Sequence, residues 1–125
     1  MSVLVDTSVW IRYLSNRAPY GEAVAALLAR DEVLAHDFVY GELLIGDKGG
    51  RKQLLASYAR IDHAPVIEHA EVTAFVRARK LHGRGVGWID IHLLASALVA
   101  GVPLWTADPA LAAAARELNI SYDPA

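Results

Sequence analysis

Short apolar segments, each followed by a segment with helical periodicity, constrain the fold of this chain more than any other feature of its sequence. The first is Val3–Val5, which predicts a buried strand leading into a helix over about residues 7–14. Further strands are expected over residues 32–36 and 102–106. Strands that alternate with helices favour parallel pairing, because a parallel connection needs a crossover that a helix provides. We therefore predict an α/β fold with a short, mainly parallel central sheet.

The remaining expected elements have apolar residues at helical spacing or end at Gly or Pro. Helices are expected over residues 22–30, 38–46, 52–60, 68–81, 89–100 and 109–118, a loop over 16–21, and a candidate last strand over 120–122. The 89–100 helix is apolar on nearly all sides, which predicts burial. A length of 125 residues and a hydrophobic content of 54% are typical of one globular domain, over residues 1–125.

Composition excludes several classes of protein. The chain has no cysteine, which excludes disulfides and thiolate metal sites and favours a reducing cytoplasm. We expect no signal peptide at the N-terminus. The longest stretch without Asp, Glu, Lys or Arg, residues 91–107, contains Gly101 and Pro103, so we expect no membrane span there. A net charge of −2 gives no general attraction to nucleic acid, so such binding would need a local basic patch or metal ions.

Two acidic residues follow apolar strand segments in surroundings without basic residues. Asp6 and Asp108 hold these positions, and Lys and Arg are absent from the first eleven residues and from residues 85–115. The carboxyl ends of the strands form the ligand-binding edge of an open α/β sheet, so we expect both carboxylates there. The alternative is that each carboxylate caps the following helix, with Thr7 and Ser8 assisting Asp6. The two roles are compatible, because a cap occupies only one carboxylate oxygen.

Two further acids fall on apolar faces of predicted helices. The residues one helical turn away from Glu42 and from Asp90 are mostly apolar, which predicts that both carboxylates face the core. For Glu42 the alternatives are a partly exposed side chain or a buried salt bridge, and for Asp90 a first-turn acid favoured by the helix dipole. A carboxylate in apolar surroundings is costly to ionise unless positive charge compensates it.

Four such carboxylates, if they converge, need a counter-charge. Oxygen ligands without a His or Cys partner at metal-ligand spacing suit a hard cation, Mg²⁺ or Mn²⁺. Hard metals in acidic pockets most often serve phosphate chemistry, in which the metal activates water and neutralises developing negative charge. The residues therefore predict a divalent-metal site that acts on a phosphate ester.

Four segments of the chain resemble, in the same order, the motifs of the PIN-domain ribonucleases, and specifically of the VapC toxins of bacterial toxin–antitoxin pairs. They are "VLVDTSVWIRYL", "YGELLIG", "GVGWIDIHLLASAL" and "PLWTADPAL", and the match runs from Val3 to about Leu118. The first and third segments are the most specific. The resemblance implies a three-layer α/β/α sandwich, an acidic pocket for Mg²⁺ or Mn²⁺, and endonucleolytic cleavage of RNA.

The resemblance also implies a role for individual residues. The implied metal-binding and catalytic acids are Asp6, Glu42, Asp90 and Asp108. Thr7 or Ser8 would hydrogen-bond to a ligand or a water molecule, and Thr106 would orient the fourth acid. Many relatives carry a further acid where this chain has Ala110, so the number of metal ions stays open.

The mechanism expected from this resemblance is metal-assisted hydrolysis of a phosphodiester. Asp6 and Asp90 would anchor the principal ion, and Glu42 would hold that ion or its waters. Asp108 would support a second ion or orient the attacking water. The products should carry a 5′-phosphate and a 3′-hydroxyl, because water attacks rather than the 2′-hydroxyl of the RNA.

A basic cluster precedes the Gly-rich segment 82–87. Its residues Arg77, Arg79, Lys80 and Arg84 are candidates for binding RNA phosphates, and the alternative is an ordinary solvated helix face.

The tryptophan and histidine side chains near the acidic motifs are more simply interpreted as structural than as functional. We expect Trp10, Trp88 and Trp105 to line the core rather than stack on bases, and His36 and His92 to have structural roles.

The expected partners also follow from the resemblance. They are a VapB-like antitoxin that occludes the pocket, often with an Arg among the acids, an RNA substrate (tRNA, rRNA or mRNA), and a second copy in a homodimer. Three other classes of protein agree less well with the sequence. A dehalogenase-type phosphohydrolase needs a second Asp where this chain has Ser8, and a receiver domain needs paired acids and a nearby Lys. Retention of all four acids argues against an inactive PIN-like RNA-binding module.

Overall fold

The computed structural model describes residues 1–124, and residue 125, the end of the predicted domain, lies outside the described part. Its sheet has three parallel strands, β1 (Val3–Val5), β2 (Val33–Leu34) and β3 (Leu104–Trp105), in the order β2-β1-β3. Because β1 is central, the chain leaves it toward β2 and later returns to its other side at β3. The carboxyl ends of β1 and β3 therefore form a topological switch point, where α/β sheets bind ligands.

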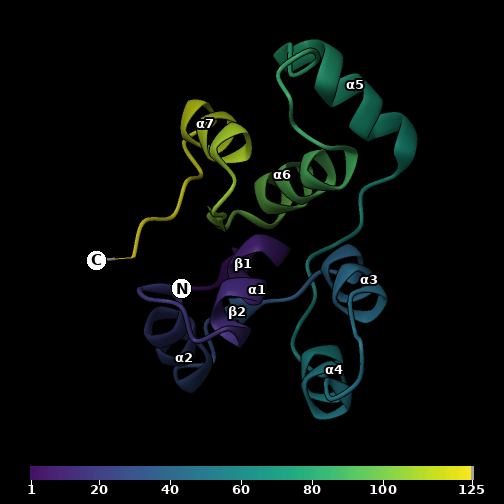
Figure 1. The fold of residues 1–125 in the computed structure, drawn as a ribbon. Helices are drawn as coiled ribbons and strands as arrows, with labels where there is room; N and C mark the ends of the chain where they lie inside the picture. The colour runs from purple at the N-terminus through teal and green to yellow at the C-terminus, as the bar shows by residue number, and fades with distance from the viewer. Residues whose placement is uncertain (125) are drawn as a thin grey trace.

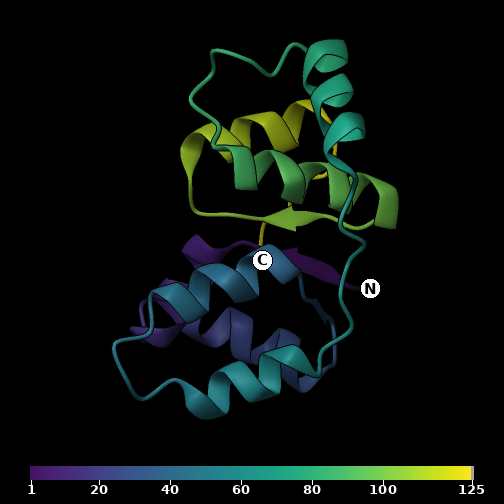
Figure 2. The same ribbon diagram turned by 90° about the vertical axis from the view of Figure 1, so that its right-hand side faces the viewer.

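Within the described residues 1–124, seven helices surround the strands, so the fold is the predicted three-layer α/β/α sandwich. They are α1 (Thr7–Leu14), α2 (Tyr20–Ala29), α3 (Asp37–Ile45), α4 (Lys52–Ala59), α5 (His69–Arg79), α6 (Trp88–Ala100) and α7 (Pro109–Glu117). Figures 1 and 2 show α5, α6 and α7 above the strands and α1 to α4 below them. Within residues 1–124, no helix is both long and apolar enough to cross a membrane.

The predicted elements are present, but several bounds differ. The outer strands are shorter than predicted because only the residues that pair with the three-residue β1 meet the sheet geometry. The candidate strand over residues 120–122 is reduced to one bridge between Leu104 and Ser121. The predicted loop over residues 16–21 ends early, because α2 begins at Tyr20, directly after Pro19.

The core forms around β1 and α6. All three residues of β1 and every residue from Ile91 to Ala97 are buried, which confirms the predicted burial of this apolar helix. Such a helix fills the centre of the molecule because no face of it needs water. It carries Asp90 in its first turn and therefore holds that carboxylate on a rigid element.

A buried polar network connects α3, α4 and α6. The fully buried His36 caps α3 by accepting at Nδ1 from the backbone N–H of Phe38 (3.0 Å), so its Nε2 carries the ring proton and donates to Ser96 Oγ (2.9 Å). Ser96 Oγ donates in turn to the carbonyl of Pro65 (2.7 Å), and Tyr58 Oη accepts from the backbone N–H of His36 (2.8 Å). Every member is satisfied, so the network fixes the three helices relative to one another. Burial lowers the pKa of His36 to about 4, which keeps the ring neutral at neutral pH. The structural role predicted for His36 is confirmed.

Candidate functional site

The candidate site lies where β1 and β3 end. Asp6 follows β1 directly, and Asp108 stands at the start of α7, shortly after β3. Helix α3 supplies Glu42, and the first turn of α6 supplies Asp90. Four segments that are far apart in the sequence thus bring one carboxylate each to the same end of the sheet, which faces the viewer in Figure 1.

Two hydroxyl groups orient the buried carboxylate of Asp6. Ser8 Oγ and Thr106 Oγ1 both donate to Asp6 Oδ2, each at 2.7 Å, and the residue is only 3% exposed. Because both donors use Oδ2, the other oxygen, Oδ1, accepts no hydrogen bond from residues 1–124. The carboxylate of Asp6 makes no side-chain cap of α1, so the capping alternative for this residue is wrong. Asp6 is held in a fixed orientation with one oxygen available to a ligand.

The same hydroxyls join the ends of β1 and β3. Ser8 Oγ accepts from the backbone N–H of Ala107 (3.0 Å), and Thr106 Oγ1 accepts from the backbone N–H of Asp108 (3.0 Å). Each hydroxyl therefore accepts a hydrogen bond from a backbone N–H of the β3–α7 connection and donates one to Asp6. This arrangement sets the position of Asp108 relative to Asp6.

Asp108 does cap the helix that follows it. Its Oδ2 accepts from the backbone N–H of Leu111 (3.1 Å), with Pro109 in the first helical position. This is the geometry that the Asp-Pro sequence predicted. The cap occupies one oxygen, so the second oxygen of Asp108 remains for the pocket.

Glu42 is bound by a hydroxyl rather than by a cation. Thr7 Oγ1 donates to Glu42 Oε1 at 2.6 Å, which ties α3 to the first turn of α1. Of the alternatives for this side chain, a buried salt bridge is wrong, because Glu42 makes none with any described residue. Its partial burial agrees with the other alternative, a partly exposed helical side chain.

Asp90 shows that the four carboxylates converge. Burial, followed by the negative charges of Asp6, Asp108 and Glu42 in that order, raises the pKa of Asp90 to about 7. Its place in the first turn of α6 favours the ionised form, but burial and the three acids outweigh that effect. No Lys, Arg or His among residues 1–124 forms an ion pair with any of the four acids. The pocket therefore concentrates negative charge without compensation from the chain.

The chemistry of these donors fits a hard divalent cation. All the charged groups are carboxylates, and hydroxyls orient two of them, so the donor atoms are oxygens of the kind that Mg²⁺ and Mn²⁺ prefer. In the part of the chain that the structure describes, no three Asp, Glu or His side chains are arranged around one point as ligands of a single ion. Mg²⁺ does not require such a cage, because it usually keeps several waters and binds through one or two carboxylates.

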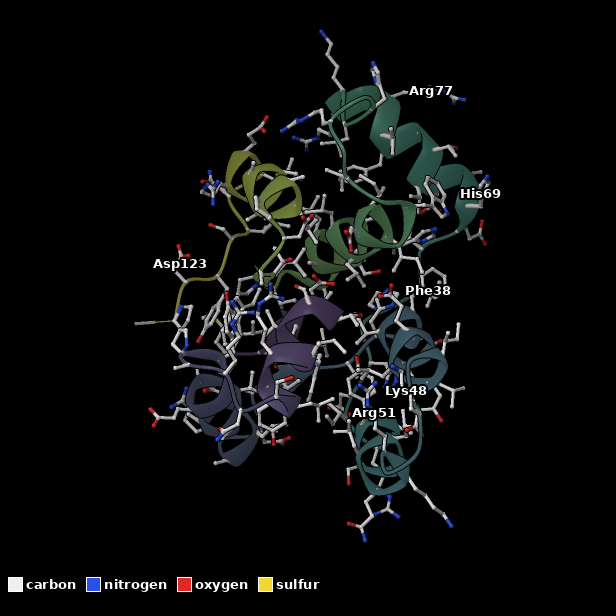
Figure 3. All side chains as sticks on the ribbon, viewed as in Figure 1. Phe38, Lys48, Arg51, His69, Arg77 and Asp123 are labelled. Atoms are coloured by element: carbon white, nitrogen blue, oxygen red, sulfur yellow. The ribbon has the colours of Figure 1, made fainter. Side chains whose placement is uncertain are left out.

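The predicted basic cluster lies along α5 and beyond it. Arg77, Arg79 and Lys80 are exposed, and none of them takes part in an ion pair among residues 1–124, whereas Arg84 pairs with Glu117. Figure 3 shows Arg77 at the far end of α5 from His69. The structure therefore does not place this cluster among the four acids.

One expectation about the tryptophans is wrong. Trp10 and Trp105 are 1% and 3% exposed and line the core as predicted, but Trp88 is 44% exposed. Trp88 is the first residue of α6, where the helix meets the protein surface. Sequence periodicity did not identify this exposure, because every neighbour of Trp88 one turn along α6 is apolar or aromatic.

Comparison with known proteins agrees with these features. A family model described as PIN domain matches residues 3–117. Ribonuclease VapC32 of Mycobacterium tuberculosis (strain CDC 1551 / Oshkosh) is 43% identical over 120 residues, which cover 95% of this chain and 94% of that protein. The protein of the same name from strain ATCC 25618 / H37Rv gives the same values. The chain therefore belongs to the PIN-domain family and, within it, to the VapC group.

Proposed function

We propose that this protein is an Mg²⁺- or Mn²⁺-dependent endoribonuclease that acts as the toxin of a toxin–antitoxin pair and inhibits translation by cleaving RNA. The observation that carries the proposal is the raised pKa of Asp90, which reflects its burial and, after that, the negative charges of three further acids around it. A cluster of carboxylates without a basic partner is stable in its ionised form only with an added cation. The relationship to a protein named a ribonuclease supports RNA as the substrate class.

Each acid has a proposed role. Asp6 and Asp90 anchor the principal ion, and Glu42, held by Thr7, binds that ion or its waters. Asp108 supports a second ion or orients the attacking water through its other carboxylate oxygen, the one that does not cap α7. Bound there, Mg²⁺ or Mn²⁺ would supply Lewis acidity that favours ionisation of water and offsets charge on the phosphodiester.

The hydroxyl residues act on these acids rather than on the substrate. Ser8 and Thr106 hold the Asp6 carboxylate in one orientation, so that it does not need to reorganise when an ion or a substrate binds. They also leave the same oxygen of Asp6 available throughout the reaction. We propose that these two residues, with Thr7, are positioning residues.

A cleavage assay tests the proposed function. Purified protein is incubated with total RNA in the presence of Mg²⁺ or of EDTA, beside the variants Asp6→Asn and Asp90→Asn. We expect cleavage only by the wild type with Mg²⁺, and 5′-phosphate and 3′-hydroxyl ends on the products. Asp62→Asn is the matched control, because it removes an exposed carboxylate outside the pocket and should cleave like the wild type. Cleavage in EDTA, full activity of either pocket variant, or 2′,3′-cyclic ends would refute the proposal.

The proposed partner in the cell is a VapB-like antitoxin. An Arg side chain from such a partner fits four carboxylates that lack a basic partner within residues 1–124, because a guanidinium binds carboxylates bidentately.

We also propose a homodimer in the cytoplasm, in which Leu44 (50% exposed) and Ile45 (87% exposed) at the end of α3 are covered. Light scattering of the isolated protein tests the dimer, and a monomer at micromolar concentration would contradict it.

A further inference from the structure

A row of aromatic rings lies across helices α3, α6 and α5 and reaches the protein surface. The ring of Phe38 meets that of His92 at a centroid distance of 4.8 Å, and His92 meets Trp88 at 5.0 Å with an interplanar angle of 89°. The outermost contact is between Trp88 and His69, at 5.3 Å. The row thus passes from the half-buried Phe38 through the buried His92 to an indole that is 44% exposed.

The exposed indole is held in one orientation. His92, only 4% exposed, supports the Trp88 ring from within α6, and His69 flanks it from the first residue of α5. Single exposed apolar side chains are common on protein surfaces. This one differs because two rings from two helices fix its plane while much of the plane stays open to solvent.

The position of the indole relates it to the acidic pocket. Trp88 and Asp90 share the first turn of α6, where Trp88 contacts His69 of α5 and Asp90 lies among the other acids. Phe38 lies one helical turn before Glu42 on α3. Figure 3 shows the labelled Phe38 and His69 on the same side of the molecule. Two of the four acids therefore lie on the same helices as the aromatic row.

The surrounding charges distinguish between the parts of a nucleotide that could bind here. Glu68 and Glu71 are exposed at the end of α5 that carries His69, so they disfavour a phosphate at Trp88. The exposed Arg77, Arg79 and Lys80 lie at the other end of α5, about 12–16 Å away at 1.5 Å per residue, and suit a phosphate backbone there. A flat, neutral base is the part of RNA that fits an indole with these neighbours.

We infer that Trp88, flanked by His69, forms a stacking site for an unpaired base of the RNA substrate, on the same helix that carries Asp90. The inference rests on the proposed ribonuclease function and adds a substrate-positioning site to it. It also implies that the substrate is single-stranded at this nucleotide, because a paired base offers no free face to an indole.

The test uses Asp6→Asn protein with Mg²⁺, which should bind RNA without cleaving it. The probe is a set of hexaribonucleotides of random sequence with 2-aminopurine at each position in turn, since stacking quenches its fluorescence. We expect quenching at one or two adjacent positions. Adding Trp88→Ala should abolish it and weaken binding about 5- to 150-fold, the usual effect of losing one base–aromatic stack. Trp88→Phe should restore most of both signals.

Val99→Ala is the matched control, because Val99 is an exposed apolar residue (65%) at the other end of α6. It should change neither the affinity nor the quenching. Unchanged affinity and quenching in Trp88→Ala overturn the inference and leave the proposed function intact if wild-type protein cleaves RNA. If Trp88→Ala leaves affinity and quenching unchanged but alters the oligomeric state, the surface at Trp88 is a protein contact. This outcome also overturns the inference. Failure of the probe to bind, together with absence of cleavage by the wild type, overturns the proposed function and the inference together.

Discussion

The hydroxyl of Thr106 donates a 2.7 Å hydrogen bond to the carboxylate of Asp6, across 100 positions of the sequence. Ser8 donates to the same oxygen from the neighbouring turn of the chain. The two bonds join the ends of β1 and β3 and orient an acid that is almost fully buried. The geometry of the proposed metal site therefore depends on a contact between the two ends of the chain.

Replacing Thr106 by Val should disturb the site more than the fold. The substitution keeps the shape but removes a donor to Asp6 and an acceptor for the backbone N–H of Asp108. We expect a loss of about 1–3 kcal/mol in the free energy of unfolding and a roughly 10- to 100-fold loss of RNA cleavage from misplaced acids. Urea denaturation and single-turnover cleavage measure the two effects. Thr73→Val on α5, which removes an exposed bond to the Ala70 carbonyl, is the control and should leave cleavage unchanged.

Asp90→Asn should abolish cleavage and yet stabilise the metal-free protein at pH 8. Because the pKa of Asp90 is raised from 3.8 to about 7 in the folded state, its contribution to stability is present at low pH and is lost as pH rises through about 7. The side chain is partly exposed, so we expect a gain of only ~1 kcal/mol, or roughly 3–6 °C in Tm. Thermal unfolding in EDTA at pH 5 and pH 8 measures it. An equal effect at both pH values would contradict the explanation.

Added Mg²⁺ should stabilise the wild type but not the pocket variants. A ligand that binds only the folded state at ten times its dissociation constant adds about 1.4 kcal/mol to the free energy of unfolding. We expect such a gain at pH 8, where Asp90 is ionised, and a smaller one at pH 5, where Asp90 is protonated. Thermal unfolding against Mg²⁺ concentration gives the measurement, with Asp6→Asn and Asp62→Asn as the paired variants. Equal stabilisation of the two variants would place the ion elsewhere.

His36 should make the fold sensitive to mild acid. Its pKa is lowered to about 4, so the unfolded chain binds a proton between pH 6.5 and 4 that the folded protein does not bind. Stability is therefore lost as pH falls through that range, at up to about 1.4 kcal/mol per pH unit. The variant His36→Gln should be less stable at pH 7 but should lose less stability on acidification. Urea denaturation from pH 7 to pH 4.5 tests this, and parallel curves for the two proteins would refute it.

Much of the fold was predictable from local patterns. Val3–Val5 and the helix after it have the predicted bounds, because an apolar run followed by helical periodicity leaves few alternatives. The bounds of β2 and β3 were not predictable, since the length of a strand depends on its partner, and β1 offers only three residues. The capping role of Asp108 was predictable from Asp-Pro, whereas the absence of a cap by Asp6 depended on the hydroxyl of Thr106, from the other end of the chain.

The sequence by itself determined which residues carry charge without a nearby partner, and so it identified Asp6, Glu42, Asp90 and Asp108 as a group. It also determined that α6 is buried, because an apolar helix has no other stable environment. Only the tertiary structure decided which hydroxyl holds which acid and that Trp88 stays exposed. These depend on contacts between segments that are distant in the chain, and local periodicity carries no information about which distant group will lie opposite a given side chain.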